Sequence, residues 1–371
     1  MKFTISSGHF LEKLNKVSAA LASNPVIPVL EDFLITSKDG SLSITASNLE
    51  LTITTQAEAQ ISKQGTIAIP GRTLMDTLKS LAEQPVQIDV NPDTNGIEIT
   101  SQSGKYKLVG EKSDDFPELS LPANEDQITM SAESLLNAID RTAFATSNDE
   151  MRQAMKGICL NIDFNSLTFA ATDAHKLVKY TFLNNQSEAS STLILTKKSL
   201  LALKSILPKD GDITIHFGRT KAFFSFDNTV LSTRLIEAKY PDYNAVIPTN
   251  NPYLLQVNRI ELLSALRRLV VYANKSTNQV VFNILDKSLT ISSQDVDMSN
   301  EATEQLSCTY QGEPITIGFN GKFLIEMLSV MNCENIHIEL SQANKPGIIL
   351  PAEQATGEQL LMLIMPIMSN Y

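Results

Sequence analysis

The feature that most constrains this chain is a phrase that occurs three times. Ser41–Glu50 reads SLSITASNLE, Ser166–His175 reads SLTFAATDAH and Ser288–Asp297 reads SLTISSQDVD, so that successive copies start 125 and 122 residues apart. The middle copy alternates apolar and mostly polar residues from Leu167 onward, which is typical of a half-buried β-strand. Such a spacing in a chain of 371 residues predicts three copies of one structural unit.

Each unit repeats the order strand, helix, strands twice, so each unit is expected to be a duplicated half. Asn258 followed by Glu261 is a capping-box signature at the start of one helix. The short strands between the helices predict an α+β fold in which two helices pack on antiparallel sheets in each domain. Amphipathic periodicity places the six helices at residues 7–23, 71–83, 131–147, 196–208, 258–275 and 320–335.

Prolines mark the joints between the units. Phe116–Leu119 (FPEL) and Tyr240–Tyr243 (YPDY) lie 124 residues apart, and each precedes a second proline, Pro122 or Pro248. Proline in an extended crossing is typical of an ordered linker. We therefore expect three domains, at residues 1–122, 123–250 and 251–371.

Composition narrows the class of protein. Apolar residues make up 43% of the chain, enough for hydrophobic cores, and charged residues make up 19%, which argues against disorder. The three cysteines follow no metal-ligand spacing, and no secretory signal opens the sequence, so we expect reduced thiols in the cytoplasm. No apolar run approaches the roughly 20 residues of a membrane span.

The net charge of −11 argues, taken alone, against a nucleic-acid partner, but the charges are unevenly distributed. The predicted helices hold 13 Lys and Arg against 8 Asp and Glu. Lys16 and Arg72 point away from the apolar stripes of their helices. Chance matches between surface lysines also occur, yet two basic positions recur in all three units: Lys16, Arg141 and Arg268 on the first helices, and Arg72, Lys198 and Lys322 on the second.

Repeats of this kind predict a pseudo-symmetric arc, and arcs close into rings by oligomerisation. If the helices of two chains line a ring at spacings of about 8–10 Å, the hole is at least roughly 20–28 Å wide, which admits duplex DNA. Lysines and arginines on that lining would contact phosphates without reading sequence. The acidic remainder would repel DNA from other surfaces.

Six short motifs follow one another in order along the whole chain: Met1–Ile5 (MKFTI), Ala171–Leu177 (ATDAHKL), Tyr240–Tyr243 (YPDY), Ile317–Asn320 (IGFN), Cys333–Asn335 (CEN) and Leu363–Met368 (LIMPIM). In this order they resemble the β sliding clamp family, the processivity subunits of bacterial DNA polymerase III. The resemblance implies half of a head-to-tail dimeric ring of clamp domains that encircles double-stranded DNA and has no catalysis of its own. It implies no cofactor and no metal. The implied partners are a second copy of the chain, the replicative polymerase α subunit, the clamp loader, repair polymerases and other proteins that bind through short peptides.

The repeat and the resemblance together assign three sets of site residues. The partner-peptide groove is implied at Met155, Thr172, Ala174, His175, Lys176, Leu177, Pro241, Val246, Asn320, Phe323, Leu363, Ile364, Met365, Pro366, Ile367 and Met368. DNA-facing residues are expected at Lys16, Arg72, Arg141, Lys197, Lys198, Arg268 and Lys322. The dimer contact is implied between Tyr106 and Leu108 on one side and Val271 and Tyr272 on the other. Ala174, Lys176 and Ala245 depart from residues common in the family, which bears on peptide preference.

Other interpretations of the same residues stay open. His175 could serve as a catalytic base, or ligate a metal with Asp173, but two ligands are too few and no partner recurs at a fixed spacing. The apolar run Leu360–Met365 suits a last core strand, with Pro366 leaving the sheet to form a groove wall. A hydrolase or transferase lacks a phosphate-binding glycine loop or paired carboxylates. A repeat-built interaction scaffold without DNA is the second alternative to a clamp.

Overall fold

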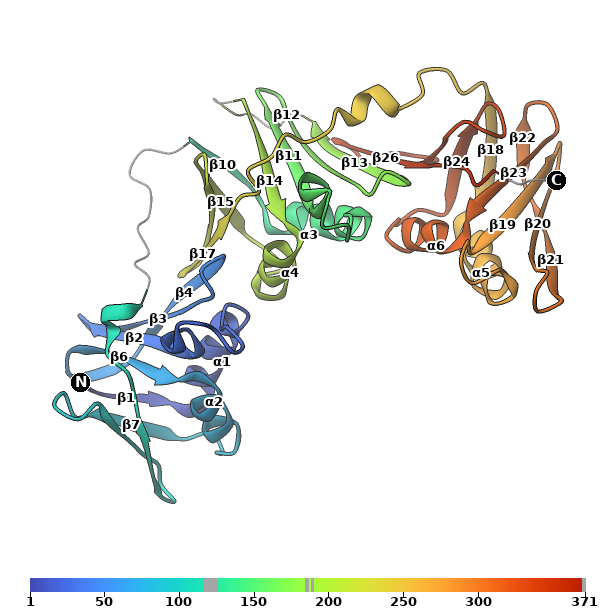
Figure 1. The fold of residues 1–371 in the computed structure, drawn as a ribbon. Coiled ribbons are helices and arrows are strands. Elements are labelled where there is room, and N and C mark those ends of the chain that lie inside the picture. Colours follow the sequence, from blue (N-terminus) through green and yellow to red (C-terminus); the bar gives the residue numbers. More distant parts are fainter. Residues whose placement is uncertain (117–125, 184–186, 188–189, 369–371) are drawn as a thin grey trace. The chain divides into compact units, whose positions relative to one another are not determined.

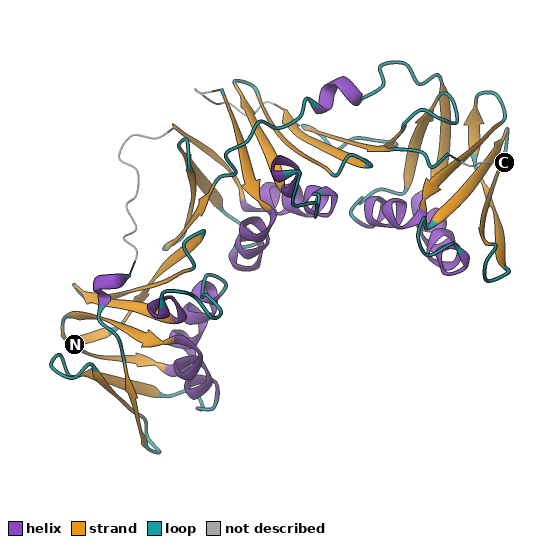
Figure 2. Ribbon diagram, in the orientation of Figure 1, coloured by secondary structure: helices purple, strands orange, loops and turns teal. Residues whose placement is uncertain are grey.

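The computed structural model describes residues 1–116, 126–183, 187 and 190–368 (Figure 1). Among them, the order of elements follows the duplicated pattern that the sequence predicts, with helices on one side and strands on the other of each layer (Figure 2). The first copy contains β1 (Lys2–Ser6), α1 (Ser7–Ser18), β2 (Asp32–Lys38), β3 (Ser41–Ser47), β4 (Leu51–Glu58), β5 (Gln60–Lys63), β6 (Gly65–Pro70), α2 (Gly71–Lys79), β7 (Pro85–Val90), β8 (Gly96–Thr100) and β9 (Lys105–Val109).

The second and third copies repeat this order. The second contains β10 (Asp126–Ser131), α3 (Ala132–Thr142), β11 (Gly157–Asp163), β12 (Ser166–Thr172), β13 (Lys176–Leu183), β14 (Ser191–Thr196), α4 (Lys197–Ile206), β15 (Asp212–Phe217), β16 (Lys221–Phe226) and β17 (Thr229–Arg234). The third contains β18 (Tyr253–Asn258), α5 (Arg259–Leu269), β19 (Gln279–Leu285), β20 (Ser288–Asp295), β21 (Asn300–Ser307), β22 (Thr309–Gln311), β23 (Ile315–Asn320), α6 (Gly321–Ser329), β24 (Asn335–Leu340), β25 (Gly347–Pro351) and β26 (Glu358–Ile364).

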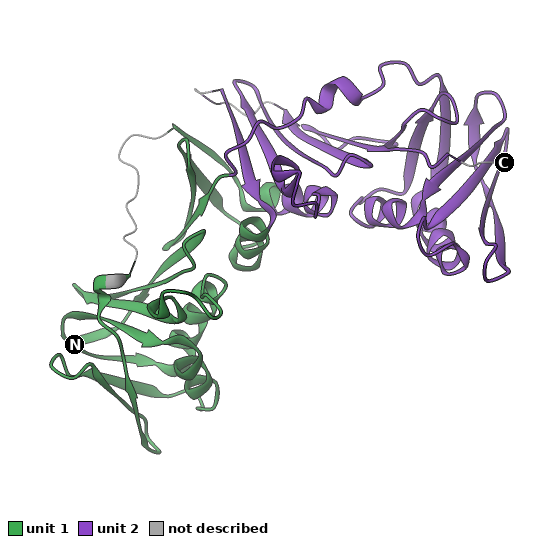
Figure 3. Ribbon diagram, viewed as in Figure 1, with its two compact units in different colours: residues 1–135, 198–235 green, residues 136–197, 236–371 purple. Residues whose placement is uncertain are grey.

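The chain packs as two compact units, one of residues 1–135 and 198–235 and one of residues 136–197 and 236–371 (Figure 3). In the first unit β17 pairs with β4, which produces an eight-stranded sheet ordered β10-β15-β16-β17-β4-β3-β2-β6 beside a five-stranded sheet ordered β5-β1-β7-β8-β9. In the second unit β13 pairs with β26, which produces a nine-stranded sheet ordered β14-β11-β12-β13-β26-β25-β24-β18-β22 beside a four-stranded sheet ordered β21-β20-β19-β23. Each large sheet therefore joins half of the second copy to a neighbouring copy.

The joints behave differently from one another. Phe116 is buried against Val29 and Ala68, while the rest of its motif, Pro122 and the expected boundary near residue 123 lie outside the described residues. The second joint continues into a short 3₁₀ helix, η5 (Tyr243–Val246), which Asp242 caps by accepting a hydrogen bond from Asn244 N at 3.1 Å. This joint is therefore an ordered linker.

Helix α1 shows why the helices form and why they are shorter than predicted. Ser6 caps its first turn by accepting a hydrogen bond from His9 N at 3.2 Å. The apolar stripe is fully buried, and Phe10 packs edge-on against Phe3 with ring centroids 6.0 Å apart. The helix ends at Ser18 because the next N–H groups bond three residues back instead of four. The other five helices also end before their predicted limits, at Lys79, Thr142, Ile206, Leu269 and Ser329.

Strand β12, from the middle copy of the repeated phrase, is not half-buried as predicted but buried on both faces. Thr168 and Ala170, on its more polar face, are 7% and 0% exposed. Thr168 hydrogen-bonds to Thr181 on β13 at 3.0 Å, and Ala170 packs in a hydrophobic cluster with Tyr240 and Tyr243 of the linker. The linker thus covers a face that the period-two pattern assigned to solvent. The third copy, β20, does alternate between buried and more exposed residues, as predicted.

Candidate functional sites

A tight turn between β12 and β13 contains the central residues of the predicted groove. Asp173 Oδ1 accepts hydrogen bonds from His175 N and Lys176 N, both at 2.9 Å, and the Thr172 hydroxyl donates to Lys176 O at 2.8 Å. Ala174 has a φ of +76°, in the left-handed region that costs a residue with a Cβ atom free energy. The turn exposes Ala174 and His175 and buries Lys176.

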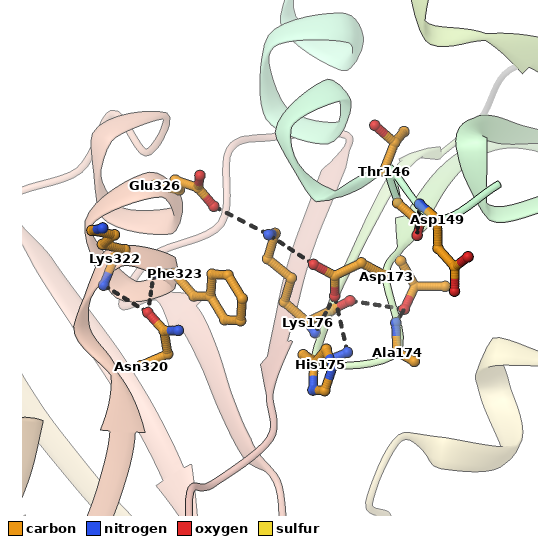
Figure 4. Close-up of polar contacts among 12 residues, drawn as sticks. Thr146, Asp149, Asp173, Ala174, His175, Lys176, Asn320, Lys322, Phe323 and Glu326 are labelled. Atoms are coloured by element: carbon orange, nitrogen blue, oxygen red, sulfur yellow. Dashed lines mark hydrogen bonds and ion pairs between the residues drawn. The ribbon is translucent and has the colours of Figure 1, made fainter. Parts of the chain in front are cut away.

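The C-terminal tail and the start of α6 lie against this turn. Strand β26 ends at Ile364, and Met365 N donates to His175 O at 2.9 Å, so Pro366 leaves the sheet as predicted. Ile367 N donates to Gly318 O at 2.8 Å, just before α6. Asn320 caps α6 by accepting from Lys322 N at 3.0 Å and Phe323 N at 3.3 Å, and the labelled side chains converge in Figure 4. Three segments that are distant in sequence therefore meet here.

The structure divides the predicted groove residues into an accessible and a buried group. The accessible group is Met155, Ala174, His175, Pro241, Val246, Asn320, Phe323, Met365, Pro366, Ile367 and Met368. The buried group is Thr172, Lys176, Leu177, Leu363 and Ile364, at 0–8% exposure. These five support the surface from below and cannot line it as predicted, because β13 and β26 pair through them inside the nine-stranded sheet.

Two further features extend the accessible group. Leu177 and Leu363 belong to the hydrophobic cluster that also contains Tyr243, which places η5 and its exposed Val246 over the same sheet. Beside the tail, a cavity of about 450 Å³ is lined by Thr316, Ile317, Gly318, Ala343, Asn344, Ile367 and Met368. Apolar, methionine-containing surfaces of this kind suit partners with varied sequences.

Lys176 differs most from its predicted role, because its side chain is only 5% exposed. Its Nζ lies 2.9 Å from Asp173 Oδ2, 3.2 Å from Glu326 Oε2 and 3.9 Å from the centroid of the Phe323 ring (Figure 4). The His175 ring lies on the same phenyl ring at a centroid distance of 6.5 Å. Asp173 and Glu326 are absent from the groove set that the sequence predicts. A lysine between a turn and an apolar strand was the available signal, since a buried ammonium needs partners.

The basic position that recurs on the first helices is engaged with carboxylates. Lys16 lies 3.7 Å from Glu12, and Arg268 binds Glu304 at 2.6 Å while remaining 60% exposed. Arg141 is only 16% exposed, binds Glu358 at 3.0 Å and lies over the Tyr180 ring at 4.5 Å. Arg141 is therefore held within its own unit, contrary to the prediction that it faces DNA.

The position that recurs on the second helices is exposed in every copy. Arg72, Lys198 and Lys322 are each the second residue of their helix, α2, α4 and α6. Along the described part of the chain, none of the three makes an ion pair within 4.0 Å, and the neighbouring Lys197 is half-buried. The helices as observed contain 12 Lys and Arg against 6 Asp and Glu, so their excess of positive charge holds.

The residues predicted for a dimer contact lie at or beside sheet edges. Strand β9, with Tyr106 and Leu108 half-buried, is an edge strand of the five-stranded sheet. Strand β21 is an edge strand of the four-stranded sheet, and the 3₁₀ helix η6 (Val270–Tyr272) lies against it. Val271 and Tyr272 on η6 are 62% and 44% exposed.

Other titratable groups point to no catalytic centre. Within the described ranges, no group of three or more His, Cys, Asp or Glu side chains is arranged to hold a metal ion, and no helix is long and apolar enough to span a membrane. Burial raises the pKa of the Cys159 thiol to about 12, which keeps it protonated and unreactive. Burial, together with the nearby Glu111 and Glu31, raises the pKa of Asp32 to about 7.

Comparisons with known proteins match this architecture over its whole length. Family models of the DNA polymerase III beta subunit match residues 1–120 (N-terminal domain), 129–242 (central domain) and 244–367 (C-terminal domain). A beta sliding clamp of Synechococcus elongatus is 30% identical over 380 residues, covering 99% of each chain. The chain belongs to the beta sliding clamp family.

Further relatives agree. A beta sliding clamp of Vibrio cholerae is 26% identical over 369 residues, covering 99% of this chain and all of the relative. The crystal structure of the Bacillus subtilis sliding clamp superposes with a TM-score of 0.95 at 26% identity, covering 100% of this chain and 99% of the other. That of a Bartonella birtlesii clamp bound to griselimycin gives 0.92 at 28% identity and full coverage of both chains. This chain is thus a sliding clamp of three clamp domains, a non-catalytic processivity subunit for DNA polymerase III.

Proposed function

We propose that two copies of this chain close head to tail into a ring that encircles duplex DNA without sequence specificity. The ring tethers the replicative polymerase α subunit, the clamp loader, repair polymerases and other clamp-binding proteins through peptides in one groove per chain. We retain domain limits at 122/123 and 250/251 and a cytoplasmic, nucleoid-associated location as parts of this proposal. The observation that carries it is the exposed, unpaired basic residue at the second position of all three second helices: Arg72, Lys198 and Lys322.

Phosphate contacts of this kind give affinity without base readout. Each of the three residues begins a helix, and the positive end of a helix dipole adds to the attraction for a phosphate. Lys16 and Arg268 are weaker candidates because Glu12 and Glu304 already neutralise them. Arg141 is omitted from the proposed set, since Glu358 and Tyr180 hold its guanidinium.

The proposed ring contact joins β9 of one copy to β21 of the other. Both are edge strands, whose unpaired N–H and C=O groups accept another strand. Their charges are complementary: β9 exposes Lys105 and Lys107, and β21 exposes Glu301. Tyr106 and Leu108 on β9, with Val271 and Tyr272 beside β21, provide the apolar part of a heterologous contact that closes after two copies.

The groove is proposed to bind an extended peptide over the accessible group defined above. Met155, Pro241, Val246, Met365 and Pro366 offer apolar contacts, and His175 and Asn320 offer polar groups at the rim. A few buried anchors carry most of the affinity in interfaces of this type. Because Asn320 already accepts two backbone bonds, its side-chain NH₂ is the group left to donate to a peptide carbonyl.

Retention on circular DNA tests the ring. The clamp is loaded onto nicked circular duplex, separated from free protein by gel filtration, and the DNA is then cut once with a restriction enzyme. We expect stable retention on the circle and rapid loss after linearisation, because a ring slides off free ends. Equal retention on circular and linear DNA would indicate an ordinary binder, and no retention on either would favour the alternative scaffold without DNA.

A further inference from the structure

We propose that Lys176 and Glu326 form a positioning pair that fixes the two walls of the peptide groove, the 173–176 turn and the first turns of α6. The proposal rests on the groove assigned above and adds Glu326 to it. Lys176 starts β13 and Glu326 lies on α6, so their ion pair at 3.2 Å connects segments 150 residues apart in the chain. Lys176 thereby acts on a bound peptide through Phe323 and His175.

The geometry around the Lys176 ammonium determines what it can do. With 5% of its side chain exposed, and with Asp173, Glu326 and the Phe323 ring around it, the ammonium has little room to meet a ligand directly. It instead makes three contacts, one to its own turn and two to α6. A desolvated cation–π contact and a buried ion pair are each stronger than their exposed counterparts.

Phe323 and His175 transmit this arrangement to the groove surface. The ammonium lies 3.9 Å from the centroid of the Phe323 ring, and the His175 ring lies 6.5 Å from the same centroid at an interplanar angle of 31°. Both rings belong to the accessible group, and Figure 4 shows Lys176 between the turn and α6. Without the ammonium, the carboxylates of Asp173 and Glu326 would repel each other across the gap, and the two walls would separate.

The backbone reinforces only one side of this link. Asp173 Oδ1 ties the turn to itself, and the His175 carbonyl accepts a bond from Met365 N at 2.9 Å. Asn320 fixes the start of α6 internally. Lys176 is thus the side chain that connects the turn with α6 by charge, and its substitution should alter groove geometry more than fold.

Peptide affinity of full-length variants tests the pair. Lys176→Met preserves the aliphatic stem and removes the charge, Glu326→Gln preserves shape, and Lys176→Arg restores a cation. Affinity for a fluorescein-labelled peptide from the replicative polymerase tail is measured by anisotropy. We expect about tenfold weaker binding for Lys176→Met and for Glu326→Gln, little further loss in the double variant, and near wild-type binding for Lys176→Arg. Lys2→Met, which removes the 2.9 Å surface pair with Asp89 in the other unit, is the matched control and should bind normally.

A second readout follows the aromatic side chain at position 323. The chain contains no tryptophan, so Phe323→Trp introduces a single fluorescent reporter at the groove wall. We expect acrylamide quenching of this reporter to increase when Lys176→Met is added and to remain low when Lys2→Met is added. A purely structural lysine would change melting temperature without this local change in quenching.

The outcomes separate the pair from the groove. If Lys176→Met does not fold, Glu326→Gln decides, because Glu326 is 43% exposed and its neutral amide is tolerated there. Unchanged peptide affinity in folded Glu326→Gln overturns the positioning pair. If Met365→Ala with Pro366→Ala also binds the peptide normally, the groove assignment itself fails. If that double variant loses binding while Glu326→Gln does not, only the pair is rejected.

Discussion

Removing two exposed side chains on η6 should open the proposed ring without unfolding the chain. Val271 is 62% exposed and Tyr272 is 44% exposed, so neither is needed in full for the core. Burying the exposed part of the valine contributes about 1 kcal/mol, and burying the exposed part of the tyrosine contributes about 2 kcal/mol. The double variant Val271→Ala, Tyr272→Ala therefore weakens each interface by about 3 kcal/mol, and a two-chain ring contains the interface twice.

The two interfaces together are weakened by about 6 kcal/mol, which reduces the dimerisation constant by roughly 10⁴-fold. Sedimentation velocity should therefore show monomers at micromolar concentration, where the parent chain is a dimer. Ile260→Ala on α5 is the matched control, since Ile260 is a similarly exposed aliphatic residue, at 58%, outside the predicted contact. Melting temperatures should be alike in all three proteins. A folded double variant with the same dimer constant as the control would refute the interface.

Three further outcomes are expected. Arg72→Glu with Lys198→Glu and Lys322→Glu should lower the salt slope of DNA retention by about 0.9 for each phosphate that the variant no longer binds, whereas charge reversal at Lys38, Lys221 and Lys287, exposed lysines off the helices, should not; equal slopes would exclude the helix positions. Met365→Ala with Pro366→Ala should weaken peptide binding at least about tenfold, or about 1.4 kcal/mol, in anisotropy titrations, with DNA retention unchanged; full-strength binding would locate partners elsewhere. Folded Asp32 holds its proton up to about pH 7, while in the unfolded chain its pKa is near 3.8, so stability should fall as pH rises between these values. Asp32→Asn should remove this fall and raise the melting temperature at pH above about 7 relative to the parent; an identical pH profile in both proteins would contradict it.

Local pattern predicted the order of elements because it depends on neighbours in the chain. The strand–helix–strands order, the repeated phrase and the exit of Pro366 from the last strand all follow from short-range periodicity and backbone chemistry. Helix ends were placed too late, because side-chain periodicity continues past the point where hydrogen bonding changes to three-residue spacing at Ala20 and Leu21. Burial of β12 could not be predicted, since it depends on Tyr240 and Tyr243 folding back over Ala170.

The buried groove residues show the same limit from another direction. A resemblance transfers positions but not their depth, so it grouped Leu177 and Ile364, which pair inside a sheet, with Met365, which is exposed. Depth here follows from the pairing of β13 with β26, a contact between residues more than 170 positions apart. Alternation along β26 gave no sign of which end reaches the surface.

The two recurring basic positions separate for a reason that the repeat itself does not contain. A repeat preserves the helix face on which a lysine or arginine lies, but not the acidic residue that the next element places opposite it. On the first helices the three copies meet three different carboxylates, at distances in the chain of 4, 217 and 36 residues: Glu12, Glu358 and Glu304. At the second position of the second helices no carboxylate of the described chain comes within ion-pair distance, so the positive charge stays available. A function that needs repeated phosphate contacts is therefore better assigned to Arg72, Lys198 and Lys322, and Arg141 is better understood as a strut between α3 and β26.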